Sequence, residues 1–333
     1  MTTAVRLVAL IMLSLALSVA GFGATDKAIA GRWAEFYLDD PGDFELADSI
    51  VDRARSELIR LIRDSLAYRP SIHVVGRQWE FDSLVGGAFP DWGAAAAIPS
   101  RRTIVIKSPD RFNVQKSLAE LLAHEYAHLA LHDRTGWSEP PRWFDEGLAM
   151  LVSTEWDWSN NLTLSKAAVF GNFVPLREIE RLNRFSAPRA EVAYAQSYVA
   201  VKYLFDEYRV DAVNTLLDWI RDAGRGDQRP TGGQPTVLDS ALIAATGTDL
   251  AGFEAEFRVY LAGRFNIVSL LVDTMFLWVL LAAVIIIGGV LAIKRRRDYY
   301  RKWEEEDALG SKDFDYGNPD QPEETDDDEP WRR

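Results

Sequence analysis

The sequence predicts an α+β fold: a mainly helical domain with a small early β-sheet, followed by one transmembrane helix. Three observations predict it. Apolar residues recur at helical spacing over most of the chain, two short runs with strand character come early, and an uncharged apolar segment comes late. The chain has 333 residues, of which 48% are hydrophobic, so it can bury a sizeable core.

The early elements are one helix and two strands. Apolar residues at helical spacing predict an amphipathic helix over Phe44 to Tyr68, which Pro70 ends. Strands are expected at Ile72 to Val75 and at Arg102 to Lys107. Between them, Gly86 to Pro99 is rich in Gly and Ala and contains two prolines, so a loop is expected there.

The later elements are all helices, and no internal repeat is visible. A Gly- and Pro-rich linker near Gly224 to Pro235 interrupts them. The expected helices are Asn113 to His132, Pro141 to Thr154, Glu191 to Tyr208, Val210 to Ala223 and Leu250 to Arg264.

The first 20 residues are typical of a signal peptide. Arg6 gives a short basic start, Leu7 to Leu17 is apolar, and Ser18 to Ala20 offers small residues for cleavage. An uncleaved N-terminal anchor is the alternative, but the apolar run is short for a membrane span. We therefore expect an exported domain that begins at about Ala24.

The late apolar segment is predicted to be a transmembrane helix over residues 267–293. Its uncharged part, Thr274 to Ile293, is long enough to cross about 30 Å of hydrocarbon. The basic cluster Lys294 to Arg297 follows at once, and positive charge marks the cytoplasmic end of a span. A single-pass protein of the cell membrane is expected, with residues 24–266 outside the cytoplasm and the C-terminal tail inside.

Charge and cysteine content exclude several classes of protein. The net charge of −13 argues against a nucleic-acid binder. From Glu304 onward there are 13 acidic and 3 basic residues, so about −10 of that charge lies in the tail. We expect residues 294–333 to be a basic stop followed by an acidic, disordered tail.

There are no cysteines, which excludes disulfides and Cys-ligated zinc. Nothing indicates an oligomeric state.

The segment His124-Glu125-Tyr126-Ala127-His128 carries the strongest chemical signal. Two histidines four positions apart share one helical face, so both imidazoles can bind one metal ion. Glu125 is rotated by about 100°, too far to ligate but able to reach a water on the metal. With only 4 histidines in the chain, an accidental match is improbable. The pattern predicts a zinc-activated water with Glu125 as general base.

A zinc site needs a third protein ligand. Glu146 is the preferred candidate, because it follows the break at Pro140-Pro141 and opens a helix that can return toward the first. Asp145 and Glu139 are rivals. His132 lies one turn beyond His128 on the same helix and is expected to stand outside the metal ligands.

The HExxH segment, followed by Trp143-Phe144-Asp145-Glu146-Gly147-Leu148-Ala149, resembles the gluzincin peptidases, and particularly the peptidase MA-like family. Ala193-Tyr194-Ala195-Gln196-Ser197 is similar to a further segment of that family. The resemblance implies a zincin-like metallopeptidase domain with one zinc per chain on His124, His128 and Glu146, and a peptide or protein substrate. It places the metal core at about residues 72–204, and residues 205–264 form a helical C-terminal part.

Tyr194 is then a candidate catalytic residue, since a phenol beside zinc can donate to a developing oxyanion. Tyr198, one turn on, is the alternative. The membrane aminopeptidases carry a Gly-x-Met-Glu-Asn loop, whose acid binds the free N-terminus of the substrate. The comparable segment here, Gly93 to Ala97, has no acid, which favours an endopeptidase. The resemblance also implies that Thr103 to Lys107 is an edge strand that pairs with substrate; an ordinary interior strand is the alternative.

The sequence predicts a zinc metallopeptidase that hydrolyses peptide bonds outside the cytoplasm. Two alternatives remain. One is a zinc hydrolase of a non-peptide substrate, and the other is a non-catalytic metal-binding or interaction module at the membrane. Glu125 favours an enzyme over the second, because zinc binding alone does not require it.

Overall fold

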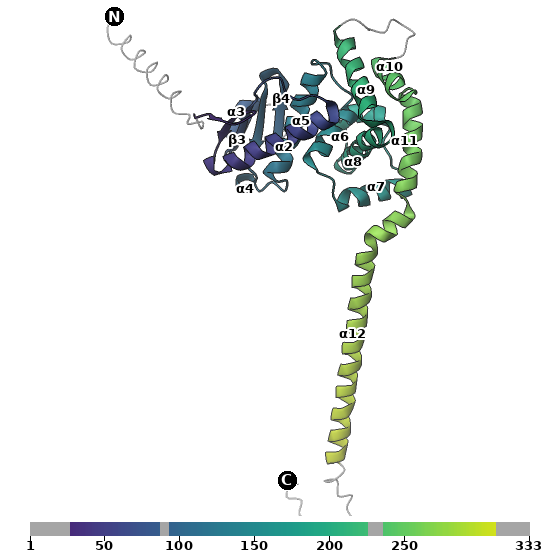
Figure 1. The fold of residues 1–333 in the computed structure, drawn as a ribbon. Helices are drawn as coiled ribbons and strands as arrows, with labels where there is room; N and C mark the ends of the chain where they lie inside the picture. Colours follow the sequence, from purple (N-terminus) through teal and green to yellow (C-terminus); the bar gives the residue numbers. More distant parts are fainter. Residues whose placement is uncertain (1–26, 87–92, 226–235, 311–333) are drawn as a thin grey trace, which may run out of the picture. The chain divides into compact units, whose positions relative to one another are not determined.

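The computed structural model describes residues 27–86, 93–225 and 236–310. These residues fall into two compact units, one ending at Asp273 and one beginning at Thr274. The expected signal peptide lies outside the described residues, as do most of the predicted linker and the tail beyond Gly310. The first unit combines a small sheet with many helices (Figure 1), which confirms the predicted fold class.

A five-stranded mixed sheet opens the first unit. The strand order is β1-β2-β3-β5-β4, in which β2, β3 and β5 run parallel and the two outer strands are antiparallel to their neighbours. The predicted strands are confirmed as β3 and β5. The strands are β1 (Ile29–Ala30), β2 (Glu35–Leu38), β3 (Ser71–Val75), β4 (Ala95–Ile98) and β5 (Thr103–Lys107).

The sheet is covered on both faces. Alternate residues of β3 and β5, including Ile72 and Ile104, join the main core with the helices α2 and α5. Val75 and Val105 point to the other face, where they pack against Phe81 of α3. In Figure 1, α2 crosses the sheet. Burial on both faces explains why β3 and β5 carry Ile and Val at their central and neighbouring positions rather than a strict alternation of apolar and polar residues.

Helices make up the rest of the first unit. Their bounds are α2 (Phe44–Ile62), α3 (Gln78–Val85), α4 (Pro109–Phe112), α5 (Leu118–Arg134), α6 (Arg142–Ser153), α7 (Trp158–Phe170), α8 (Ala187–Tyr203), α9 (Arg209–Gly224), α10 (Val237–Thr246) and α11 (Leu250–Arg264). A π-helical turn, Leu204–Tyr208, follows α8, and short 3₁₀ turns lie at Pro41–Asp43, Pro99–Arg101 and Leu176–Arg184.

The helix α5 begins later than the sequence suggests. Ser117 is its N-cap: its hydroxyl accepts from the Glu120 amide, and the Glu120 carboxylate accepts from the Ser117 amide. This capping box starts the helix at Leu118 rather than at Asn113, whose φ of 51° ends α4 instead. The reciprocal bonds fix the helix that carries the HExxH segment.

The helices α6 and α8 pack closely at a glycine. A Cβ added to Gly147 would lie 2.2 Å from the backbone oxygen of Ser197, far inside van der Waals contact. Only glycine allows the backbones to approach this closely. The contact joins the two motif segments that the sequence analysis singled out, Glu146-Gly147 on α6 and Tyr194 to Ser197 on α8.

Two expectations about early elements are wrong. The helix α2 ends at Ile62 instead of Tyr68, because Arg63 adopts left-handed backbone angles and closes it. The expected loop over Gly86 to Pro99 contains the strand β4, Ala95–Ile98. Alanine has little strand preference, so this strand depends on its pairing with β5.

A long helix, α12 (Ile267–Gly310), ends the described chain. Within the described residues, one helical stretch is long and apolar enough to cross a membrane, by length and composition alone, and it includes the predicted span. The helix continues past the basic cluster, so residues 298–310 are helical and not disordered as expected. This stretch is rich in Arg, Lys and Glu, which favour helix, and Arg301 pairs with Glu305 at 3.7 Å.

Candidate functional site

Both histidines of the HExxH segment project from the same side of α5. Their ring centroids lie 4.8 Å apart, and the rings are nearly perpendicular, with an interplanar angle of 76°. The flanking residues Tyr126, Ala127 and Leu129 are buried in the core. The helix is therefore held with its two imidazoles toward α6.

Glu146 on α6 completes a cluster that can hold a metal ion. One donor atom each from His124, His128 and Glu146 lies within 4.8 Å of the others. The Oε2 atom of Glu146 is 3.5 Å from Nε2 of His124 and 3.9 Å from Nε2 of His128. Tetrahedral zinc with bonds of about 2.0–2.1 Å needs donor separations of about 3.3 Å, so the three side chains would have to close in slightly on the ion. The donor set is the one that zinc prefers, and the cluster is a candidate metal site.

The other ring nitrogens are held by carboxylates. Nδ1 of His124 lies 2.7 Å from Oε1 of Glu155, and Nδ1 of His128 lies 2.6 Å from Oδ1 of Asp145. A ligand histidine usually donates its second N–H to such a partner, which fixes the tautomer and orients the ring. Both imidazoles are thus set to offer Nε2 to a metal.

Arg142 fixes the third member of the cluster. It stands one turn before Glu146 on α6, and its Nη2 atom lies 2.5 Å from Oε1 of that carboxylate. Glu146 is 3% exposed, so its charge requires compensation. With one oxygen bound to Arg142, the other oxygen remains directed at the two imidazoles.

The other two candidates for the third ligand, Asp145 and Glu139, lie outside the cluster of His124, His128 and Glu146. Asp145 bonds to Nδ1 of His128 and also lies 3.7 Å from Nε2 of His132, so it connects two histidines from outside the cluster. Glu139 is exposed. The fourth histidine, His73, lies in β3 and stacks on Tyr37.

The carboxylates control the protonation of the metal-free site. Burial lowers the pKa of His124, but hydrogen bonds to Glu146 and Glu155 outweigh it and raise the pKa to about 10. The pKa of His128 is also raised, because Asp145 outweighs the effect of burial. Burial opposes ionisation of Glu155, yet its bond to His124 and the nearby Lys116 lower its pKa to about 2. Metal binding must therefore displace protons.

Glu125 is free for chemistry. It is half-buried, and among the residues that the structure describes it has no hydrogen-bond or ion-pair partner. Three other acids beside the cluster are engaged, namely Glu146 by Arg142, Asp145 by His128, and Glu155 by Lys116 at 2.6 Å. An unengaged carboxylate beside a metal cluster can accept a proton.

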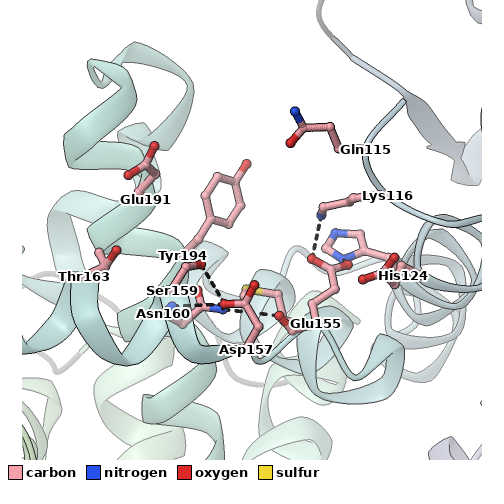
Figure 2. A pocket seen from close by; sticks show the side chains of 12 residues that line it. Gln115, Lys116, His124, Glu155, Asp157, Ser159, Asn160, Thr163, Glu191 and Tyr194 are labelled. Carbon is pink, nitrogen blue, oxygen red and sulfur yellow. Dashed lines mark hydrogen bonds and ion pairs between the residues drawn. The ribbon is translucent and has the colours of Figure 1, made fainter. Parts of the chain in front are cut away.

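A pocket of about 610 Å³ opens beside the cluster and is lined by both His124 and Tyr194. In Figure 2, Tyr194 stands across the pocket from His124 and Lys116. Burial and the charge of Glu146 raise the pKa of the Tyr194 phenol, so it remains a proton donor. Tyr198 instead stacks on Trp156 at 4.5 Å and is not among the lining residues. The geometry favours Tyr194 of the two candidates.

The strand that was expected to pair with substrate is interior. β5 lies between β3 and β4, so its backbone is already paired on both sides. The edge strand on that side is β4, which contacts α5. Any pairing of an extended peptide with this side of the sheet would therefore use β4.

The fold and the site define a class of protein: a metallohydrolase of the HExxH type, with its third candidate ligand on the following helix. A family profile described as the Peptidase MA superfamily matches residues 78–263, more than half of the chain. The chain belongs to this superfamily and is a metallopeptidase of it. The match confirms the resemblance inferred from the motifs. None of the curated proteins compared with the chain matches it.

Sequence reasoning missed Arg142, Glu155 and Lys116. Arg142 precedes Glu146 by one helical turn, a spacing that could have indicated their ion pair. Glu155 comes just after α6, where Thr154 has a left-handed conformation and turns the chain back toward α5. No local pattern marks that return, so its contact with His124 could not be read from the sequence.

Proposed function

We propose that this protein is a membrane-anchored zinc metallopeptidase that cleaves peptide bonds outside the cytoplasm, as an endopeptidase. One observation carries the proposal: His124, His128 and Glu146 converge within 4.8 Å of one another, beside a carboxylate, Glu125, that has no partner among the described residues. Membership of the Peptidase MA superfamily supports peptides as the substrate class.

Each residue has a role in this mechanism. His124, His128 and Glu146 would hold the zinc ion, which would polarise the substrate carbonyl and acidify the attacking water. Glu125 accepts the proton of that water and delivers it to the leaving amine. Tyr194 donates a hydrogen bond to the carbonyl oxygen as negative charge develops on it. Asp145, Glu155 and Arg142 keep the ligands in position.

The metal assignment is tested on the full-length protein in detergent micelles. We expect about one zinc per chain by mass spectrometry, hydrolysis of a mixed peptide library, loss of hydrolysis on chelation, and recovery when zinc returns. Glu146→Ala should lose the metal. Glu139→Ala changes an exposed acid in the connection between α5 and α6 and should keep it. Full zinc retention in Glu146→Ala would contradict the ligand set.

The proposed location rests on the apolar part of α12 and the basic residues after it. We propose a signal peptide over residues 1–20, an extracytoplasmic peptidase domain over 24–266, a membrane span over 267–293 and a cytoplasmic tail over 294–333. Protease added to intact cells should remove the peptidase domain and spare a tag placed after Arg333. Digestion of the tag with survival of the domain would reverse the orientation.

A further inference from the structure

The outer side of α7 exposes several large apolar side chains. Positions separated by four, three and four residues form one stripe along a helix, and in α7 they hold Trp158, Leu162, Ser165 and Val169. Trp158 is 52% exposed and Val169 is 39% exposed, while Phe170, the next residue, is 69% exposed. A surface helix usually turns such residues toward the core, so this side of α7 indicates a contact with a partner.

The same stripe contacts the start of α12. The hydroxyl of Ser165 lies 3.1 Å from the hydroxyl of Ser269, in the first turn of that helix. Ser165 is buried, although it belongs to a stripe whose other members are partly or largely exposed. The start of α12, up to Asp273, belongs to the first unit, and Figure 1 shows α7 next to it. The helix α7 is therefore held at the point where the chain leaves the first unit.

The connection between α11 and α12 is fixed by its own contacts. Phe265 is buried, and its ring centroid lies 6.4 Å from that of Trp156. Asn266 caps α12, because its side-chain oxygen accepts from the amides of Val268 and Ser269 at 2.9 and 3.1 Å. The start of α12 is thus an ordered part of the first unit and not a flexible linker.

The uncharged part of the proposed membrane span begins close to α7. It starts at Thr274, five residues after Ser269, which is about 8 Å at the rise of an α-helix. Apolar side chains before Thr274 are also exposed, among them Ile267 and Leu271. This closeness follows from the chain alone and holds for any tilt of the span. Ser165 of α7 therefore lies within about one helix diameter of the point where the chain enters the hydrocarbon.

We propose that the exposed side of α7 lies on the outer surface of the lipid bilayer, so that the peptidase domain is docked on the membrane as well as anchored in it. The inference rests on the proposed membrane span, whose start beside α7 identifies lipid as the occupant. Trp158 supplies a ring of the kind that lies at the level of the headgroups. Val169 and Phe170 enter the boundary of the acyl chains, and Lys166 extends its ammonium group to lipid phosphates. Because α7 also lines the metal-cluster pocket through Thr163, the docking keeps this pocket near the membrane surface.

The test uses labels on single cysteines in the full-length protein, which has no cysteine of its own. Val169→Cys reports on α7, and Ile59→Cys, at a 47% exposed position of α2, is the matched control. Leu280→Cys reports on the proposed span. Each variant carries an environment-sensitive fluorophore and is placed in phosphatidylcholine nanodiscs that contain a lipid with a doxyl quencher on its upper acyl chain.

An interfacial helix buries its apolar side by about 5–10 Å, so we expect the labels at positions 169 and 280 to lose roughly half of their fluorescence. The label at position 59 should lose none. Quenching at 280 but not at 169 would overturn the docking and leave the span in place. Quenching at neither position would overturn the span, and the docking with it. Shielding of position 169 from aqueous iodide without quenching by the lipid would assign this face to a second copy of the chain and would also overturn the proposal.

A second set of variants separates insertion from proximity. The label is placed at Lys166→Cys, and Val169→Glu with Phe170→Glu puts two charges on the same side of α7. Charge is unfavourable in hydrocarbon, so quenching at position 166 should fall to less than about half of its value. The control pair is Leu46→Glu with Ile59→Glu on α2, which Figure 1 shows over the sheet and away from the start of α12. This pair should keep full quenching, and circular dichroism should show that all variants are folded. Equal quenching in the two pairs would overturn the proposal.

Discussion

Oδ1 of Asp145 lies 2.6 Å from Nδ1 of His128, while Nε2 of the same ring faces Glu146, the residue next to Asp145 in the chain. Adjacent residues of α6 therefore serve the two nitrogens of one imidazole in different ways. One carboxylate orients the ring, and the other shares the metal position with it. Their adjacency in the chain explains why Asp145 remained a rival when the sequence favoured Glu146 as the third ligand.

Asp145→Asn should weaken zinc binding by about 10- to 100-fold while leaving the three ligands in place. The amide retains the size of the side chain but loses the charge that stabilises the donating tautomer of His128. Competition with a fluorescent zinc chelator measures the change. Asp157→Asn is the control, because Asp157 caps α7 and has no hydrogen bond to either histidine. Unaltered zinc affinity in Asp145→Asn would rule out the orienting role.

Gly147→Ala should destabilise the protein by about 1–3 kcal/mol, since the new methyl group would overlap the backbone of Ser197. The helices α6 and α8 must then separate, which also displaces Glu146 relative to the histidines. Thermal unfolding and zinc affinity should both decline. Gly263→Ala on α11 has no neighbour within 4 Å and should be neutral or stabilise by about 0.5–1 kcal/mol. Equal melting temperatures for the two variants would show that the close approach is unimportant.

Zinc binding near neutral pH should release up to about two protons per chain. In the metal-free protein the pKa of His124 is raised to about 10, so this ring carries a proton near neutral pH, and the pKa of His128 is raised as well, which favours a second proton. The apparent affinity should accordingly increase with pH up to about 10. Calorimetry in two buffers with different ionisation enthalpies measures the release. An identical binding enthalpy in both buffers would contradict it.

The same shifts predict a stability profile for the metal-free protein. Because the folded-state pKa of His124 is above its unfolded value, its contribution is complete below about 6.5 and is lost as the pH rises through about 10. Burial opposes ionisation of Glu155, but pairing with His124 lowers its pKa to about 2, so its contribution disappears only as the pH falls toward that value. Denaturant unfolding of zinc-stripped protein at several pH values should show that the free energy of unfolding decreases as the pH rises through about 10 and as it falls toward about 2.

Tyr194→Phe should lower kcat by about 100-fold and change KM little, because the phenol acts on charge that develops in the transition state. Tyr198→Phe is the matched control one turn away; its ring stacks on Trp156 outside the pocket lining, so kcat should not change. Steady-state kinetics on one peptide substrate compare the two variants. A larger loss in Tyr198→Phe would reverse the assignment.

The predictable part of the fold is the part where local pattern and tertiary structure agree. The helix Leu250–Arg264 was expected with the bounds it has, and β3 and β5 were expected because their apolar runs are buried on both faces. The helix α7 was missed, because Asn and Ser residues at its start obscure the pattern. β4 was missed because Ala95 to Ala97 form a strand only through pairing with β5.

The candidate site divides in the same way. His124, Glu125 and His128 share one helix, so helical geometry alone relates them. Glu146 reaches the two histidines only because the chain reverses before α6. The prolines at 140 and 141 indicate a break there but do not determine the direction of the chain after it. The bond between Glu155 and His124 and the position of Thr163 in the pocket lining depend on the packing of α6, α7 and α8, and no spacing in the sequence encodes them.

The most direct test of the mechanism is Glu125→Gln, measured for both zinc content and peptide hydrolysis. Gln has the size of Glu but cannot accept the water's proton, and Glu125 is outside the His124, His128 and Glu146 cluster. We predict about one zinc per chain, unchanged from the wild type, together with a fall in kcat of about 10²- to 10⁴-fold. Undiminished hydrolysis by zinc-loaded Glu125→Gln would contradict the mechanism.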